Sequence, residues 1–231
     1  MDWNRYWLRA KGAHQRGLYE VIAEFYRNQI ISRSAAAILS GYFRNDPGAQ
    51  YLHAGCGSGG SDGRIALDRA RFHLLDISPV ALELSRGRPS RLNRSYVCGD
   101  IFSLPFGPET IDGIFNFGVM EHFSEADINR ILSEFSRVLK RKGRVVLFWP
   151  PDFGLSVIVL SSFLRVVNAF RSRPLELYPH EISRIKSFAW VRQVMGRNGF
   201  MVLGLKFGLR DLFTFVTVVA ERSAIDGRVR S

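Results

Sequence analysis

Short apolar runs alternate along this chain with longer stretches whose apolar residues recur every three or four positions. The short runs have the length of β-strands, and the longer stretches have the spacing of helices that bury one face. Strand–helix alternation of this kind favours a parallel sheet with helices on both of its faces. The sequence therefore predicts an α/β fold, with strands at residues 51–54, 72–76, 95–98, 113–117 and 144–149.

The last part of the chain departs from this alternation. A helix expected over 190–197 is followed by two apolar runs, at 200–207 and 212–220. The few residues between these runs permit only an antiparallel hairpin. We therefore expect a mostly parallel sheet with an antiparallel last strand.

A strong helix signal covers residues 128–139 and is followed by Lys140-Arg141-Lys142-Gly143. A basic last turn and a glycine are both favoured at the C-terminus of a helix. The helix is therefore expected to end within this basic segment, immediately before the strand that begins at residue 144.

The pattern of apolar and polar residues changes along the chain and divides it into a cap, a core and an insertion. Residues 1–47 are helical in pattern and are expected to form a cap, 48–150 and 187–222 form the core, and 151–186 form a helical insertion. The insertion carries a nearly continuous apolar run over 153–170. A membrane-spanning helix needs about 20 apolar residues with few charges. Because Arg165 interrupts a run that is already short, we expect no transmembrane segment.

Composition narrows the class of protein. Of the 231 residues, 46% are hydrophobic and 23% charged, which is typical of a globular domain and excludes disorder. Two cysteines are too few for a disulfide framework or a zinc cluster, so no metal site is expected. The first residues lack the apolar run of a signal peptide, which predicts a cytoplasmic location.

The formal net charge of +11 suggests an anionic partner, such as nucleic acid, a membrane surface or an acidic substrate. However, only five of the 32 cationic residues are lysines, and the arginines are scattered along the whole chain. A compositional bias towards arginine explains the charge equally well.

A glycine-rich turn follows the first strand, at residues 54–60. Glycines allow a sharp turn and a close approach of the backbone to a ligand. Their spacing satisfies both G-x-G-x-G, ending at Gly59, and the dinucleotide pattern G-x-G-x-x-G, ending at Gly60. Asp76 ends the second strand, where an acidic side chain can bind both hydroxyls of a ribose.

Polar residues also follow the third and fourth predicted strands. Asp100 follows the third strand, and the fourth strand continues through Asn116-Phe117 to Glu121-His122. Together with the glycine loop and Asp76, these residues resemble the class I S-adenosylmethionine (SAM)-dependent methyltransferases. The resemblance is strongest to the branch of quinone-biosynthesis and related small-molecule methyltransferases, and it covers residues 48–150 and 187–221.

The resemblance implies a Rossmann-like sheet of seven strands, mostly parallel with an antiparallel last strand, and SAM as the cofactor. In that family the glycine loop passes under the methionine part, the acid after strand two binds the ribose, and the acid after strand three meets the adenine. The tip of strand four faces the methionine end. The cofactor-binding positions implied in this chain are His53, Gly55, Gly57, Gly59, Asp76, Ile77, Asp100, Ile101, Asn116 and Phe117.

His53 is a departure from the family pattern. Two residues before the first glycine, the family usually has Asp or Glu, which helps to position the ammonium group of the cofactor. A neutral imidazole can accept a hydrogen bond but adds no charge attraction. Contact with the cofactor and a hydrogen bond to the backbone remain equally good explanations of His53. The helix after the loop is also poorly supported, because Ser61-Asp62-Gly63 contains no apolar residue.

Methyl transfer depends mainly on alignment of the reactants and exclusion of water. A general base helps when the acceptor is a hydroxyl. Glu121 and His122 lie where the substrate pocket of the family begins, and His180 lies in the insertion. These three are the candidate catalytic residues, with an orienting role for His122 and a surface position for His180 as the alternatives.

The family builds its acceptor pocket from the N-terminal helix and an insertion after strand five, and both are rich in apolar or aromatic residues here. We therefore expect a small, hydrophobic or lipid-linked acceptor, with peripheral contact to an anionic membrane as a further expectation. A buried cap over a small aromatic acceptor explains the insertion equally well. A nucleic-acid substrate is disfavoured, since the Asn/Asp-Pro-Pro-aromatic motif of such enzymes is missing after strand four.

Two other functions remain open at this point. A nucleotide-binding oxidoreductase would use the same glycines, and comparison of SAM with NAD binding separates it from a methyltransferase. A catalytically silent SAM-binding partner subunit is the second alternative, and turnover of SAM would exclude it.

Overall fold

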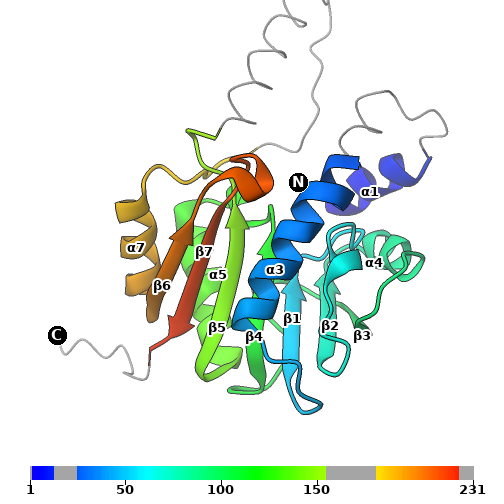
Figure 1. Ribbon diagram of the computed structural model, residues 1–231, viewed down its shortest axis with the longest axis horizontal. Helices are drawn as coiled ribbons and strands as arrows, with labels where there is room; N and C mark the ends of the chain where they lie inside the picture. The colour runs from blue at the N-terminus through cyan, green and yellow to red at the C-terminus, as the bar shows by residue number, and fades with distance from the viewer. Residues whose placement is uncertain (1, 13–24, 155–180, 224–231) are drawn as a thin grey trace, which may run out of the picture.

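The computed structural model describes residues 2–12, 25–154 and 181–223. Seven strands form one sheet in the order β3-β2-β1-β4-β5-β7-β6 (Figure 1). The first five pair in parallel, whereas β7 is antiparallel to both β5 and β6. The predicted fold class is therefore confirmed. The strands are β1 (Gln50–Ala54), β2 (Arg71–Asp76), β3 (Asn93–Cys98), β4 (Ile111–Phe117), β5 (Leu139–Trp149), β6 (Phe200–Lys206) and β7 (Val216–Arg222).

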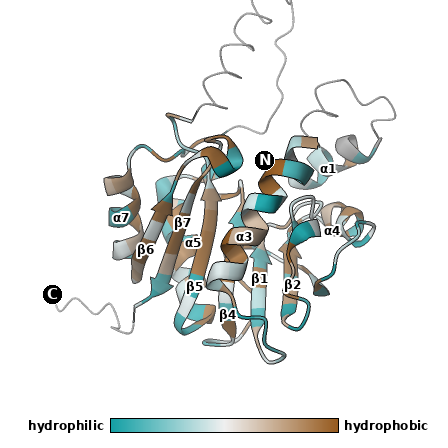
Figure 2. Cartoon of the chain, viewed as in Figure 1, coloured by the Kyte–Doolittle hydropathy of each residue, from teal (hydrophilic) through white to brown (hydrophobic). Residues whose placement is uncertain are grey.

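Helices cover both faces of the sheet. On one face, α3 (Ser32–Tyr42) and α4 (Pro79–Arg86) contribute Leu39 and Leu82 to one buried cluster. On the other face, α5 (Glu125–Val138) and α7 (Phe188–Arg197) pack their apolar sides against a second cluster. Figure 2 shows the inner strand β5 as mostly hydrophobic, as expected for a strand buried on both faces. Among the described residues, no helix is long and apolar enough to cross a membrane.

Two of these helices have serine caps at the edge where the parallel strands end. Ser78 accepts a hydrogen bond from the Ala81 backbone N–H, and Pro79 follows it at the start of α4. Ser124 accepts a hydrogen bond from the Asp127 N–H at the start of α5. Such caps satisfy N–H groups that lack partners within the helix. They fix where the chain turns from strand to helix, next to the predicted site residues.

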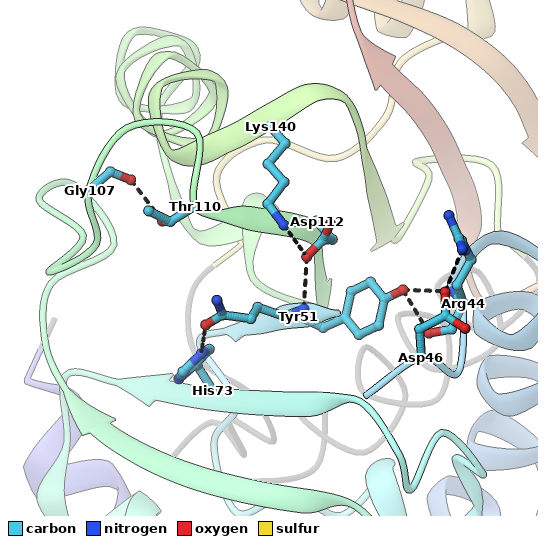
Figure 3. A network of polar contacts seen from close by, with 9 residues as sticks. Arg44, Asp46, Tyr51, His73, Gly107, Thr110, Asp112 and Lys140 are labelled. Carbon is cyan, nitrogen blue, oxygen red and sulfur yellow. Dashed lines mark hydrogen bonds and ion pairs between the residues drawn. The ribbon is translucent and has the colours of Figure 1, made fainter. Parts of the chain in front are cut away.

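The basic segment Lys140–Gly143 does not end a helix, and that prediction was wrong. Helix α5 ends at Val138, and β5 begins at the next residue. The pairing with β4 steps from Leu139 to Arg144, so these four residues bulge from the ladder, with Lys142 in a left-handed conformation (φ 61°). Lys140 Nζ instead lies 2.8 Å from both carboxylate oxygens of Asp112 (Figure 3). This ion pair joins β5 to β4, a contact that local sequence does not reveal.

The final hairpin is confirmed, but its second strand begins later than predicted. Leu212 and Phe213 both have positive φ, 52° and 57°, which is a turn conformation. The strand β7 therefore begins at Val216. The turn also holds Phe215, whose N–H donates to Asp211 Oδ2 at 3.1 Å.

Candidate active site

The glycine-rich turn lies at the carboxyl end of β1, between β2 and β4. This is the point where the strand order reverses direction, and open α/β sheets bind ligands there. Gly55, Gly57 and Gly59 have positive φ values of 73°, 52° and 63°, a conformation that side chains disfavour. These three are the G-x-G-x-G set. The N–H of Gly55 donates to the Leu75 carbonyl at 2.8 Å, which ties the loop to the end of β2.

Asp76 ends β2 facing this loop, and its side chain is only 7% exposed. Its Oδ2 accepts from the Gly57 N–H at 2.8 Å, and its Oδ1 accepts from the Ser78 N–H at 2.9 Å. Burial raises the pKa of Asp76, and these backbone hydrogen bonds act in the opposite direction. Each oxygen keeps a second lone pair, so the carboxylate can still accept from ribose hydroxyls. The next residue, Ile77, is 53% exposed and free to lie against a flat ring.

The structure separates the two predicted adenine-binding residues after β3. Asp100 is exposed, and its Oδ1 accepts from the Phe102 N–H at 3.0 Å. The side chain of Ile101 instead belongs to the buried core under α5. Of these two residues, only Asp100 has its side chain exposed at the carboxyl edge of the sheet.

The tip of β4 combines a polar and an aromatic residue. The Asn116 side chain is fully buried, and both of its polar atoms lack a hydrogen-bond partner among the described residues. Unpaired buried amides are rare in folded proteins, because their desolvation is costly. Phe117 packs against Phe148 with its ring centroid 4.4 Å away. The pairing of β4 with β1 places this unpaired amide beside the start of the glycine loop, where a polar ligand could satisfy it.

Glu121 and His122 lie together in the turn that follows β4. Glu121 is buried, and burial raises the pKa of this carboxyl group to about 8, so that it is protonated at neutral pH. Its Oε1 lies 4.0 Å from His122 Nε2, and its Oε2 has no partner in the part of the chain that the structure describes. The Glu121 carbonyl accepts from the N–H groups of Ile182 and Ser183 at 2.6 and 2.9 Å. The returning end of the insertion is thus fixed beside this turn.

Helix α1 (Trp3–Gly12) lies above the ends of the parallel strands (Figure 1). The Trp7 ring covers the glycine loop so closely that a Cβ added to Gly57 would lie 2.8 Å from its Cζ2. The Trp3 ring meets the His122 ring edge-on, with centroids 5.0 Å apart. Asn4 Oδ1 accepts from the Ser78 hydroxyl at 3.0 Å. One helix therefore touches three parts of the predicted site.

Among the described residues, His53 bonds to a side chain and not to the backbone. It is 2% exposed, and its Nδ1 lies 3.1 Å from Asp62 Oδ2. Nothing in the sequence pattern distinguished Asp62, because its segment showed only a poor helix signal. His180 and the apolar run of the insertion beyond Gly154 lie outside the described residues.

Among the described residues, neither the cysteine near the loop nor a metal-binding cluster offers a second site. Burial raises the pKa of the Cys56 thiol, which keeps it protonated and unreactive. No cluster of three His, Cys, Asp or Glu side chains suited to a metal ion occurs within the described ranges. A shallow basic hollow, lined in part by Arg44, Lys140 and Lys142, lies at the amino ends of β1 and β4, opposite the glycine loop. Its lining includes Asp46 and Asp112, which pair with two of these cations.

Comparison with known proteins shows that part of this chain is similar to methyltransferases. Residues 52–147 match a family model described as a methyltransferase domain. The chain is 34% identical over 119 residues to malonyl-(acyl-carrier protein) O-methyltransferase of Serratia marcescens, covering 51% of this chain and 44% of that protein. It is 30% identical over 103 residues to phthiotriol/phenolphthiotriol dimycocerosates methyltransferase of Mycobacterium leprae, covering 44% of this chain and 37% of that protein. The chain thus spans less than half the length of these curated relatives.

A solved structure has a similar fold. Magnesium protoporphyrin IX methyltransferase from Synechocystis PCC 6803, crystallised with S-adenosylhomocysteine (SAH), aligns with a TM-score of 0.66. The alignment covers 94% of this chain and 93% of that one at 19% identity. Residues 52–147 are thus similar to a methyltransferase domain, and the glycine loop, Asp76 and the turn after β4 all lie within that matched stretch. The domain match favours this class over a nucleotide-binding oxidoreductase.

Proposed function

We propose that this chain transfers a methyl group from SAM to a small, hydrophobic or lipid-linked acceptor. The observation that carries the proposal is the coincidence of the methyltransferase-domain match with the glycine loop and Asp76 at one edge of the sheet. The chemistry supplied by bound SAM is an activated methyl group on a positively charged sulfur. All other tasks fall to the residues of the chain.

Cofactor binding is assigned to residues that the fold brings to this edge. Asp76 binds the ribose hydroxyls, Ile77 covers the adenine, and Asp100 accepts from the adenine amino group. The loop of Gly55, Gly57 and Gly59 lets the backbone approach the methionine part. The unpaired amide of Asn116 supports its assignment to the same end.

The parts outside the sheet are assigned to closure of the site. Residues 1–47 act as a cap and 151–186 as a cover for the acceptor, on a core of 48–150 and 187–222. The contacts of Trp7 with the glycine loop and of Trp3 with His122 support the first assignment. Two indole rings over the site exclude water. Exclusion of water strengthens the polar contacts that align the acceptor with the methyl group.

Proton handling at the acceptor is assigned to the turn after β4. Because Glu121 is protonated at neutral pH, it can donate a hydrogen bond to a bound ligand and cannot itself act as a base there. His122, next to it, is the group that can accept a proton from an acceptor hydroxyl. We assign His122 the role of base or orienting group, and Glu121 that of a donor that fixes what binds beside it. His180 remains a third candidate from the insertion.

The nature of the acceptor is inferred from apolar residues and from the relatives. Leu209 and Leu212 are 76% and 48% exposed in the turn between β6 and β7, and Phe153 lies 42% exposed after β5. Phe207 contacts both Phe153 and Phe213, with centroids 5.4 and 5.2 Å away. The two curated relatives act on malonyl-acyl carrier protein and on phthiotriol dimycocerosates. An acceptor held by apolar contacts fits both observations.

Conversion of SAM to SAH tests the proposal when candidate acceptors are added one at a time. The panel pairs each hydrophobic acceptor, presented in anionic lipid vesicles or on an acyl carrier protein, with a short-chain, water-soluble analogue. We expect turnover with a hydrophobic member, loss of turnover in His122→Asn, and unchanged SAH affinity in that variant. If only the water-soluble analogues are methylated, the assignment of a hydrophobic acceptor is wrong.

A further inference from the structure

The buried pair of His53 and Asp62 places a carboxylate next to the glycine loop. Asp62 begins a single helical turn, Asp62–Arg64, and its N–H donates to the Gly59 carbonyl at 3.2 Å. A Cβ added to Gly59 would lie 3.4 Å from Asp62 Oδ2. The carboxyl group therefore lies against the third glycine of the loop, inside the predicted cofactor site.

The Asp62 carboxylate is buried but only half satisfied. The residue is 1% exposed, and Oδ2 pairs with His53 Nδ1 at 3.1 Å. The other oxygen, Oδ1, has no hydrogen-bond partner among the described residues. A buried carboxylate oxygen without a donor is costly, because it has lost its hydration and gained nothing in exchange. A cationic hydrogen-bond donor would satisfy it best.

His53 is held firmly in place beside this carboxylate. Its ring stacks on Phe115, with centroids 4.3 Å apart and the planes 24° from parallel, and meets the edge of Phe117 at 5.5 Å. With its Nδ1 directed at Asp62, the imidazole fixes the rotation of that carboxyl group. His53 therefore occupies the family's acidic position without itself supplying a negative charge.

We propose that Asp62 is the carboxylate that binds the α-ammonium group of SAM, and that His53 is a positioning residue which orients it. In this chain the carboxylate that the family has at the position of His53 is replaced by that of Asp62, nine residues further along. The inference rests on the proposed cofactor site. It assigns a carboxylate to the ammonium group of SAM, for which position 53 supplies none. It accounts for both the histidine at position 53 and the unpaired Oδ1.

Two ligands separate this role from a purely structural one. SAH carries the α-ammonium group, whereas 5′-methylthioadenosine has the same adenosine and sulfur but no amino-acid part. We expect Asp62→Asn to weaken SAH binding by roughly tenfold or more, since it removes a charge-assisted bond of about 1.5–3 kcal/mol. Binding of 5′-methylthioadenosine should change by less than about twofold. Both affinities are measured by calorimetric titration of the full chain.

Asp68→Asn is the matched control for charge. Asp68 is exposed, lies six positions further along the chain, and pairs with Asn45 at 3.0 Å. It changes the net charge by the same amount, so SAH should bind it as it binds the wild-type chain. Equal weakening in both variants would show a long-range effect of charge and would overturn the proposal.

His53 variants test the positioning role and replace Asp62→Asn if that variant does not fold. His53→Asn keeps an N–H donor near the place of Nδ1, whereas His53→Leu removes it. We expect His53→Leu to weaken SAH binding more than 5′-methylthioadenosine binding, and His53→Asn to restore much of the difference. The proposal is overturned if a folded Asp62→Asn binds SAH normally, or if either His53→Leu or Asp62→Asn weakens both ligands equally. A wild-type chain that binds neither ligand would instead contradict the cofactor site itself.

Discussion

Asp76 and Glu121 are both buried carboxyl groups, but their surroundings give them different tasks. Asp76 accepts from two backbone N–H groups, whereas Glu121 has one oxygen without a partner among the described residues. Burial favours the neutral form of a carboxyl group, and hydrogen bonds to the charged form oppose that effect. Asp76 is therefore suited to accept from hydroxyl groups, and Glu121 is suited to hold a proton.

Asp76→Ala should weaken SAM binding by roughly tenfold or more, because the loss of a charged acceptor costs about 1.5–3 kcal/mol. The same variant frees the Gly57 N–H, so the loop loses its anchor as well. Asp100→Ala should weaken binding less, because the adenine also packs on apolar neighbours. Calorimetric titration with SAM measures both. An unchanged affinity in Asp76→Ala would remove this residue from the site.

Glu121→Gln should alter the pH dependence of stability. The folded-state pKa of Glu121, about 8, lies above its ordinary value of 4.5. The folded protein thus retains a proton that the unfolded chain releases, so wild-type stability falls as pH rises from about 4.5 towards 8. Glutamine has no proton to lose. The free energy of unfolding of Glu121→Gln should therefore gain ~2 kcal/mol or more on the wild type between pH 5 and pH 8.

Urea unfolding of the two proteins at pH 5, 6.5 and 8 provides the measurement. His122→Asn, unfolded under the same conditions, controls for titration of the neighbouring imidazole. Parallel stability curves for Glu121→Gln and the wild type would show that Glu121 is ionised in the folded protein, and would remove its role as a proton donor.

Local patterns in the sequence predicted most of the strands and helices, and non-local contacts decided the rest. The four strands β1 to β4 and helix α7 lie within two residues of their predicted positions, since each has the period of its element. The segment Lys140–Gly143 has the composition of a helix end, but its pairing with β4 and Asp112 is set by residues far away in sequence.

In the candidate site, too, local patterns predicted some residues and non-local contacts decided the others. Glycines and acids at strand ends predicted the loop and Asp76, because the carboxyl ends of parallel strands meet at one edge. The contact of His53 with Asp62, and the tryptophans of α1 above the loop, required the folded chain. Burial also could not be predicted for Ile101, whose side chain packs in the core although its neighbour Asp100 is exposed.

Lys142→Gly should stabilise the bulge at the start of β5. Lys142 has a φ of 61°, and a left-handed conformation costs a non-glycine residue about 1–2 kcal/mol. Glycine removes this strain but adds freedom to the unfolded chain, so the free energy of unfolding should rise by roughly 0.5–1 kcal/mol. Thermal and urea unfolding measure the effect. Arg141→Gly, at the neighbouring exposed position without positive φ, should be destabilising, and equal effects of the two glycines would contradict the assignment.

We propose that the protein makes peripheral contact with anionic membranes. The net charge of +11 and the exposed apolar residues near the site support this proposal. Electrostatic attraction to anionic lipid falls with salt, whereas burial of apolar side chains does not. These two contributions can be separated in one binding experiment.

The chain should bind vesicles that contain anionic lipid at low salt, and raised salt should weaken that binding. Replacing Arg165, Arg171 and Arg173 together should reduce vesicle binding and leave SAM affinity intact. Sedimentation with vesicles measures the first effect, and calorimetry measures the second. Absence of binding to anionic vesicles at low salt would contradict the membrane proposal and leave the insertion as a cover for a soluble acceptor.

We propose that the carboxyl edge of this sheet binds SAM as a class I methyltransferase domain does. Calorimetric titration of the wild-type chain with SAH, and separately with NAD, measures this. We predict SAH binding with a dissociation constant on the order of micromolar, and no measurable binding of NAD under the same conditions. Binding of NAD in place of SAH would contradict the proposed cofactor site and would assign the glycine loop a dinucleotide-binding role.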